Sequence, residues 1–383
     1  MADRDNCAFA AQFVPIPSLE TAAFTNAATG VSQDGKIVAG WSDSSEGVRA
    51  FRWTVDEGIQ SLGAGFMPGS MERVSQATAI SADGSVIVGW THYFDTISWS
   101  ARQMAFIWTA QGGFHTIPAS NGNNYIPHAL SSDGSVIVGE AGSSSTYRYA
   151  VIFHWDDSIE TMLGSYWYGV QAIGVSHDGL RIAGSGVYGS SGYYPRRTFL
   201  YDEVEGYQLI GDSSSDAFTK ATALSADGQL IAGVLDATDS SIFRWSESTG
   251  LIDAGTLSGA LNTGIVAVNE TGDIMVGRAG TVNNWSAVIW DQTSGYQLLA
   301  EYAAQTLSLD LQGWQLTQAN AVTRYAIVGV GINPDGISKA WMILLDIFGD
   351  ANNDSDVDGH DLYLYAQGAD FSNVSGFAAE YGK

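Results

Sequence analysis

Oxygen-bearing side chains are concentrated near the end of the 383-residue chain, in the string FGDANNDSDVDGHDLYLY. If Asp350 is position one, then Asn352, Asp354, Asp356 and Asp361 occupy positions three, five, seven and twelve. Oxygen ligands at this spacing, with a main-chain carbonyl at position seven, encircle a calcium ion. We therefore predict calcium as a cofactor bound by these five residues. The alternative is a solvated acidic linker.

Histidines, which serve as general bases and metal ligands, follow no shared pattern in this chain. They are His92, His115, His128, His154, His177 and His360. No zinc spacing, nucleophile elbow or phosphate-binding loop is present, so the catalytic residues are unknown. An enzyme stays open as an alternative, because His92, Tyr93 and the cluster from Tyr193 to Arg197 have the side chains of a polysaccharide lyase.

Aromatic and basic side chains gather in long segments such as THYFDTISWSARQ, GSYWYG and SGVYGSSGYYPRR. Aromatic rings offer flat apolar area with a polar tip, which suits sugars and protein partners. The predicted ligand-binding residues are Tyr93, Trp99, Trp167, Tyr188, Tyr193, Tyr194, Arg196 and Arg197. Tyr125, Tyr168 and Trp285 lie in similar segments, and any one of these rings can instead pack beneath its loop.

The net charge limits the possible partners. Acidic residues outnumber basic ones by 41 to 16, which gives a formal charge of -25. This charge repels nucleic acids and anionic membranes and attracts cations. The sequence contains no run of 18 apolar residues, the pattern that would predict a membrane span. Cys7 is the only cysteine, so no disulfide can form within the chain.

A repeat connects these segments. The string GVSQDGKIVAGW at 30–41 is the first of seven copies that differ in detail, and the variable position of its S-x-D-G turn holds His177 in one of them. The copies close on Gly40, Gly89, Gly139, Gly184, Gly233, Gly277 and Gly329. Each copy is followed by an aromatic string, among them AFRW at 50–53, AFIW at 105–108 and IFHW at 152–155, and then by a final apolar string such as GIQSLG or GYQLLA. From their recurrence we expect Trp53, Trp108, Trp155, Trp245 and Trp290 to pack between repeats.

Each repeat therefore predicts four short strands, with an Asp-Gly hairpin between the first two. Four strands at this period indicate the blades of a β-propeller. The last repeat lacks its fourth strand, and Ala11–Leu19 supplies a matching string. We predict an all-β, seven-bladed β-propeller closed by this N-terminal strand at residues 11–346, and a calcium loop with a helix at 347–383.

The two ends of such a propeller differ in their loops. The connections between strands one and two and between strands three and four are short, for example QDG and DEG, and they share one end. The remaining connections are long and irregular and share the other end. Because variable loops on a rigid scaffold commonly carry function, we expect the site at the loop-bearing end.

The aromatic strings that follow S-x-D-G-x-x-I/V-V-G resemble HAF repeats, which are named for a similar strand in predicted extracellular bacterial proteins. The stretch LQGWQLTQANAV…IVGVGINPDGISKAWMILL is similar to the last repeat of HAF-repeat proteins of the PEP-CTERM type. The acidic segment resembles a single dockerin loop. These resemblances imply secretion, and the polar start of the chain is interpreted as that of a mature protein from which a signal peptide has been removed.

We therefore expect an extracellular or cell-surface binding or assembly module for a glycan or a protein. Two alternatives are an extracellular polysaccharide lyase and a structural subunit of a surface layer or filament that self-assembles through its C-terminal segment. No nucleic acid and no membrane span are expected.

Overall fold

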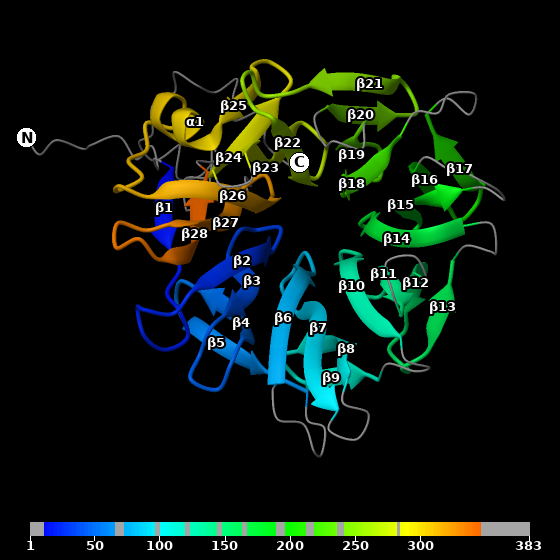
Figure 1. The fold of residues 1–383 in the computed structure, drawn as a ribbon, viewed down its shortest axis with the longest axis horizontal. Coiled ribbons are helices and arrows are strands. Elements are labelled where there is room, and N and C mark those ends of the chain that lie inside the picture. The colour runs from blue at the N-terminus through cyan, green and yellow to red at the C-terminus, as the bar shows by residue number, and fades with distance from the viewer. Residues whose placement is uncertain are drawn as a thin grey trace, which may run out of the picture.

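The computed structural model describes residues 11–65, 73–95, 100–118, 123–143, 148–162, 167–188, 196–211, 218–235, 241–281 and 284–345. These residues form seven antiparallel sheets of four strands each, arranged around a central axis (Figure 1). The prediction of a seven-bladed propeller is confirmed. Blades are numbered one to seven below, from the sheet that begins with residue 26.

In each blade the strands follow one another outward from the axis (Figure 1). The innermost strands are β2 (Asn26–Val31), β6 (Arg73–Ile80), β10 (Asn124–Leu130), β14 (Trp167–Val175), β18 (Lys220–Leu224), β22 (Asn262–Val268) and β26 (Gln315–Val322). The second strands are β3 (Ile37–Ser42), β7 (Val86–Asp95), β11 (Ile137–Gly142), β15 (Arg181–Tyr188), β19 (Ile231–Val234), β23 (Ile274–Thr281) and β27 (Ala326–Ile332).

The third strands are β4 (Arg49–Thr54), β8 (Ser100–Thr109), β12 (Arg148–Phe153), β16 (Arg196–Asp202), β20 (Ile242–Ser246), β24 (Asn284–Asp291) and β28 (Ser338–Leu344). The outer strands are β5 (Gly58–Gly63), β9 (Gly113–Ile117), β13 (Ile159–Thr161), β17 (Gly206–Ile210), β21 (Gly250–Gly255), β25 (Gly295–Leu298) and, for blade seven, β1 (Gln12–Pro15).

The N-terminal strand closes the ring as predicted. β1 pairs antiparallel with β28, with Pro15 opposite Trp341. Beyond this pairing, the buried ammonium group of Lys339 donates a hydrogen bond to Ser18 Oγ. The link between the first and last blades therefore combines a strand pairing with a buried polar contact.

The S-x-D-G turns owe their uniform shape to a repeated set of hydrogen bonds. In blade one, Ser32 Oγ donates to Asp34 Oδ1 over 2.6 Å, and the Asp34 carboxylate accepts the N–H of Lys36 at 3.0 Å. Gly35 has a φ of 72°, a left-handed conformation that glycine adopts without steric cost. The predicted Asp-Gly hairpin is confirmed here, and the same bonds recur in blades two to five.

The glycine that closes each copy is required by close contact. A Cβ on Gly89 would lie 2.1 Å from the main-chain oxygen of Gln76 and 2.7 Å from the ring of Phe106. The innermost strand has a bulge at this level, between Ala77 and Ala79. The fully buried Phe106 ring fills the space that a side chain at position 89 would need.

The aromatic strings pack between blades in most copies, but the register of the third copy differs from the prediction. Trp53, Trp245 and Trp290 are buried, whereas Trp155 is 46% exposed. Gly139 lies opposite Val151, so Phe153 takes the place that Trp53 has in blade one. The predicted packing role of Trp155 is therefore wrong, because its string is shifted by two residues.

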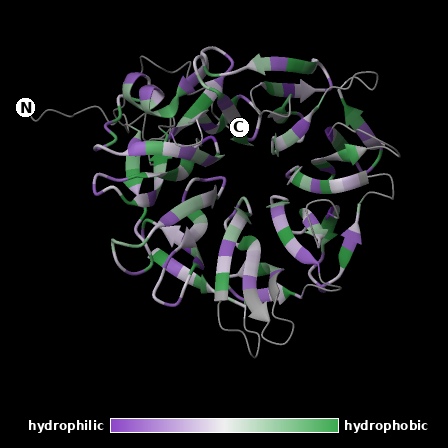
Figure 2. Ribbon diagram, in the orientation of Figure 1, coloured by the Kyte–Doolittle hydropathy of each residue, from purple (hydrophilic) through white to green (hydrophobic). Residues whose placement is uncertain are grey.

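Hydrophobic residues are spread over all seven sheets (Figure 2). They form separate clusters between neighbouring blades rather than one central core. The string GYQLLA, predicted as an outer strand, ends as a strand at Leu298 and continues as helix α1 (Leu299–Gln305). Leu299 and Ala303 of this helix are buried between blades six and seven.

Candidate functional site

Four of the predicted ligand-binding residues lie at the loop-bearing end of blade four. The main chains of Trp167 and Tyr188 pair between β14 and β15, and Arg196 and Arg197 begin the adjoining strand β16. Tyr93 lies on β7 in blade two, opposite Arg73 and Arg102. Only the main-chain positions of Tyr93, Trp167 and Tyr188 are described. Trp99, Tyr193, Tyr194 and the predicted calcium ligands lie outside the described residues.

A buried carboxylate between blades three and four organises the same region. Glu140, on β11, is 3% exposed. Its Oε1 lies 2.9 Å from Nη1 of Arg148, and its Oε2 accepts a hydrogen bond from Gln171 of blade four. Nε2 of His128 lies 3.8 Å from Oε2, which is beyond hydrogen-bond distance. Sequence reasoning missed this carboxylate, which stands where the first two copies have tryptophan.

The surroundings of Glu140 keep it ionised. Burial opposes ionisation, but His128, Gln171 and Arg148 act in the other direction, and the net effect lowers the pKa of Glu140. Burial and the nearby Arg148 lower the pKa of Arg196, whose Nη1 donates to the main-chain oxygen of Gly169 at 3.2 Å. Arginine stays protonated in proteins in spite of such a shift. We call Glu140, Arg148, Gln171 and Arg196 the blade 3–4 cluster.

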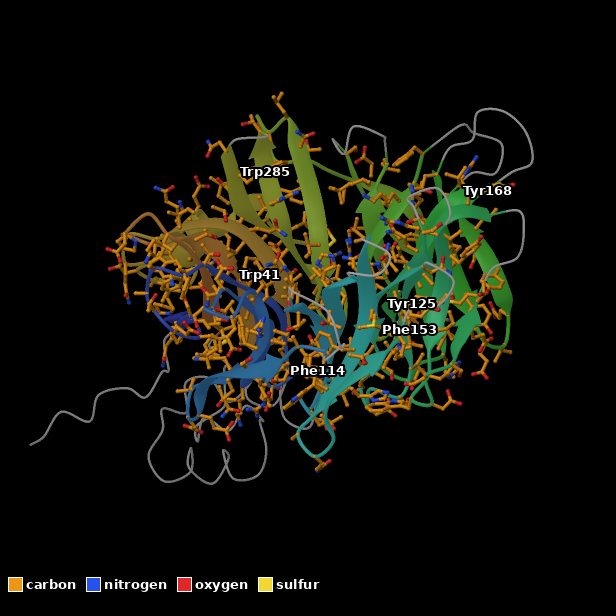
Figure 3. All side chains as sticks on the ribbon, turned by 60° about the horizontal axis from the view of Figure 1, so that its bottom comes forward. Trp41, Phe114, Tyr125, Phe153, Tyr168 and Trp285 are labelled. Atoms are coloured by element: carbon orange, nitrogen blue, oxygen red, sulfur yellow. The ribbon has the colours of Figure 1, made fainter. Side chains whose placement is uncertain are left out.

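The aromatic residues of this end have different roles (Figure 3). Tyr168, at the start of β14, is 45% exposed. Tyr125 is buried and packs against Phe153 with ring centres 6.0 Å apart, so it belongs to the core. Trp285, on β24, carries the guanidinium of Arg278 over its ring at 4.3 Å. Tyr168, which precedes the Gly169 that accepts from Arg196, is thus open to solvent, and so is Tyr149, which follows Arg148 and is 43% exposed.

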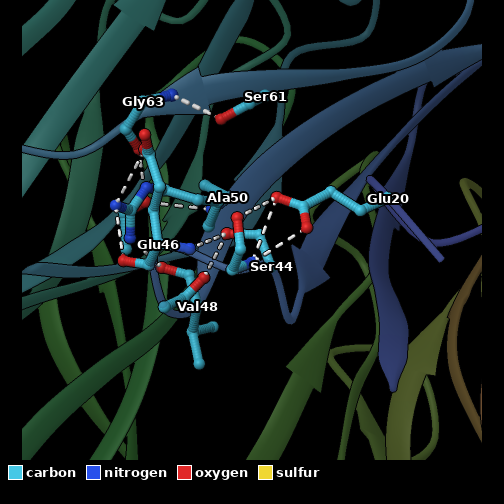
Figure 4. Close-up of polar contacts among 11 residues, drawn as sticks. Glu20, Ser44, Glu46, Val48, Ala50, Ser61 and Gly63 are labelled. Carbon is cyan, nitrogen blue, oxygen red and sulfur yellow. Dashed lines mark hydrogen bonds and ion pairs between the residues drawn. The ribbon is translucent and has the colours of Figure 1, made fainter. Parts of the chain in front are cut away.

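The same end of blade one has another chemistry (Figure 4). The Glu20 carboxylate accepts hydrogen bonds from the N–H of Ser45, at 3.0 Å, and from Ser45 Oγ, at 2.8 Å. Arg49 is buried there and donates to the main-chain oxygen of Glu46 over 2.8 Å. These groups hold a short loop in place, and acidic side chains predominate.

A pocket opens on the axis at the opposite end, where the S-x-D-G turns meet. It has a volume of about 120 Å³ and takes lining residues from all seven blades, which places it on the axis. The variable residues of the turns contribute Gln33, Ser132, His177 and Glu270 to its lining. We call it the axial pocket. A partial signal was present in the sequence, because five copies share the S-x-D-G turn and differ at its second position.

Two further observations concern the described residues. Within their ranges, no three His, Cys, Asp or Glu side chains are grouped as a metal site requires. None of the helices formed by them has the length and apolar character needed to cross a membrane.

No protein-family profile and no curated protein matches the sequence. Among solved structures, an oligogalacturonate lyase in complex with manganese superposes with a TM-score of 0.53 at 11% identity, over 88% of this chain and 97% of that one. A chain of the mitotic checkpoint complex gives 0.50 at 14% identity, over 91% and 97%. TolB from Acinetobacter baumannii gives 0.48 at 17% identity, over 69% of this chain and 63% of that one, so the chain spans less than two thirds of TolB. At these identities the likeness establishes the propeller fold alone.

Proposed function

We propose that this propeller is an extracellular or cell-surface binding module that recognises an acidic glycan at the loop-bearing end of blades three and four. The observation that carries the proposal is the charge of the blade 3–4 cluster. Arg148 and Arg196 lie at one buried carboxylate, Glu140, so the cluster is positive in a chain with a formal charge of -25.

The geometry suits a sugar acid. A guanidinium group binds a carboxylate through two parallel hydrogen bonds, and its charge makes these bonds shorter and stronger than neutral ones. Arg148 is 35% exposed at its side chain although it is anchored by Glu140, so part of its donor edge faces solvent. The exposed ring of Tyr168 offers a surface on which a sugar face packs. The predicted ligand residues Trp167, Tyr188 and Arg197 border the same place.

A glycan array that contains neutral, uronate and sulfated oligosaccharides tests this proposal on the intact chain. We expect binding to uronate or sulfated members and none to neutral members of equal length. Preference for neutral glycans would contradict the proposal, as would an array on which nothing binds.

A lyase is the second candidate, and one observation favours it. Nε2 of His128 is buried without a hydrogen-bond partner beside Glu140 and Arg148, which is where a general base could act. The glycans that bind are therefore incubated with the protein and assayed for unsaturated uronate products by ultraviolet absorbance. Products that disappear in His128→Gln would establish the lyase; bound but unchanged glycan supports the binding module.

The acidic C-terminal segment completes the proposal. Asp350, Asn352, Asp354, Asp356 and Asp361 would bind one calcium ion. The resemblance to dockerin loops and to HAF-repeat proteins supports calcium binding and secretion. Docking of this segment on a neighbouring copy is the remaining alternative, a structural subunit, and it would appear as calcium-dependent oligomers in sedimentation.

A further inference from the structure

We propose that the axial pocket binds a primary alkylammonium group, presented as a lysine side chain of a protein partner. This site lies at the end opposite the blade 3–4 cluster and does not depend on the glycan proposal. Its lining, its charge and its rigidity each contribute to the inference.

The wall of the axial pocket is apolar where the innermost strands end. Val31, Ile80, Leu130, Val268 and Val322 all contribute to it. Each water in the liquid occupies about 30 Å³, so a pocket of about 120 Å³ holds roughly four groups of that size. A short, straight aliphatic chain on the axis would contact this ring of side chains on all sides. The stem of a lysine has this shape.

The charge in the axial pocket comes from Glu270. Burial raises the pKa of this carboxyl, while its own N–H and the N–H and charge of Arg324 oppose the rise. Burial lowers the pKa of His177, against the influence of Asp178 and Asp227, so the imidazole is neutral at pH 7. Of the side chains that line the pocket, only Glu270 can then carry a charge at neutral pH. An ammonium group beside it would offset the cost of burying a carboxylate.

Carboxylates also occur in the turns at this end of the propeller. Each of the first five S-x-D-G turns carries one, at Asp34, Asp83, Asp133, Asp178 and Asp227. Their summed potential favours a cation at the axis over a neutral or anionic ligand. The positive group that acts on Glu270 is Arg324, whose guanidinium lies 5.7 Å from the ring centre of Tyr325.

The rim of the axial pocket is held rigidly by main-chain hydrogen bonds between turns. The N–H of Gln33 donates to Ala82 at 2.8 Å, that of Ala82 to Ser132 at 3.0 Å, and that of Ser132 to His177 at 3.1 Å. This series of hydrogen bonds continues, because the N–H of His177 donates to Ala226 and that of Asp227 donates to Glu270. The Glu270 carboxylate then accepts the N–H of Arg324 at 3.0 Å. Because the main-chain groups are used in this way, the side chains of the variable residues decide what binds.

Titration of the isotope-labelled full chain with Nα-acetyl-lysine methylamide tests the site. The control ligand is Nα-acetyl-norleucine methylamide, which has the same aliphatic stem without the ammonium group. We expect saturable shifts of the main-chain amides of Ala82, Ser132 and His177 with the lysine ligand. The norleucine ligand should bind at least tenfold more weakly. Equal binding of the two ligands, or no saturation with either, would overturn the proposal.

Variants distinguish the effect of the Glu270 carboxylate from the effect of the protein's overall negative charge. Glu270→Gln keeps an acceptor for the N–H of Arg324 and should weaken binding about tenfold, as expected for one hydrogen bond to a charged group. Asp273→Asn removes the same charge from the same turn, outside the pocket lining, and should change affinity less than twofold. Arg324→Gln should tighten binding. An unchanged affinity in Glu270→Gln would contradict the proposal. If butylamine bound and the lysine ligand did not, the assignment of a protein partner would be contradicted.

Discussion

The glycine within each second strand is required because neighbouring atoms leave no room for a side chain. Gly89→Ala would push a methyl group against the oxygen of Gln76 and the ring of Phe106. Overpacking of this kind costs about 1–3 kcal/mol of unfolding free energy. Gly264→Ala is the matched control, because a Cβ there meets no atom within 4 Å. Chemical denaturation of both variants checks this, and equal stabilities would show that the bulge adjusts freely.

The S-x-D-G carboxylates make stability depend on acidity. Hydrogen bonds from the main chain of Ser135, and from the side chains of Ser135 and Ser131, lower the pKa of Asp133 from 3.8 to about 2. Because the folded pKa is depressed, this stabilisation is present above about pH 4 and is lost as the pH falls towards 2. We expect the free energy of unfolding of Asp133→Asn to depend less steeply on pH in this range than that of the wild type. Parallel acid-denaturation curves for the wild type and the variant would contradict the assignment.

At the scale of elements, the N-terminal strand closes the ring. Removal of residues 1–19 would delete β1 and the Ser18 contact of Lys339, and would expose an edge of β28. Exposed edges invite pairing with other chains. We expect a lower melting temperature and concentration-dependent association in sedimentation, both reversed by a synthetic peptide of residues 11–19. A monomeric truncation with unchanged melting would contradict the role of β1.

The C-terminal segment carries a prediction that is independent of the blades. Its carboxylates between Asp350 and Asp361 repel one another until a cation binds. We expect limited proteolysis to cut this segment in chelator and to spare it in millimolar calcium. Asp350→Ala should abolish the protection, whereas Asp358→Asn should matter less, since position nine acts through water. If calorimetry detected no calcium binding up to several millimolar, the segment would be an acidic linker and the prediction would be wrong.

Sequence patterns predicted some of these elements and missed others. Repeat counting predicted the number of blades and the position of β1, because both follow from local patterns and from the need to pair a last edge. It misplaced Trp155, since only the pairing of Gly139 with Val151 sets that register. It missed Glu140 and the axial pocket, because residues from different repeats meet there and single-repeat patterns do not report such contacts.

At the scale of the whole molecule, charge distinguishes the blade 3–4 cluster from the turns at the opposite end. The short turns carry Asp34, Asp83, Asp133 and Asp178. The third strands of blades three and four begin with Arg148 and Arg196 at the loop-bearing end. A strongly acidic protein with a local basic cluster can attract an anion to that place alone. The proposed glycan site and the proposed lysine site therefore take ligands of opposite charge on opposite ends of one axis.

The most direct test of the glycan site is the affinity for an oligouronate, measured by calorimetry at increasing salt. The account predicts that binding weakens with salt. It also predicts a loss of about tenfold or more in Arg148→Gln/Arg196→Gln, because hydrogen bonds to charged groups are lost. Arg52→Gln, which removes an arginine paired with Glu57, should bind like the wild type. Affinity that ignores salt and survives the double substitution would contradict the account.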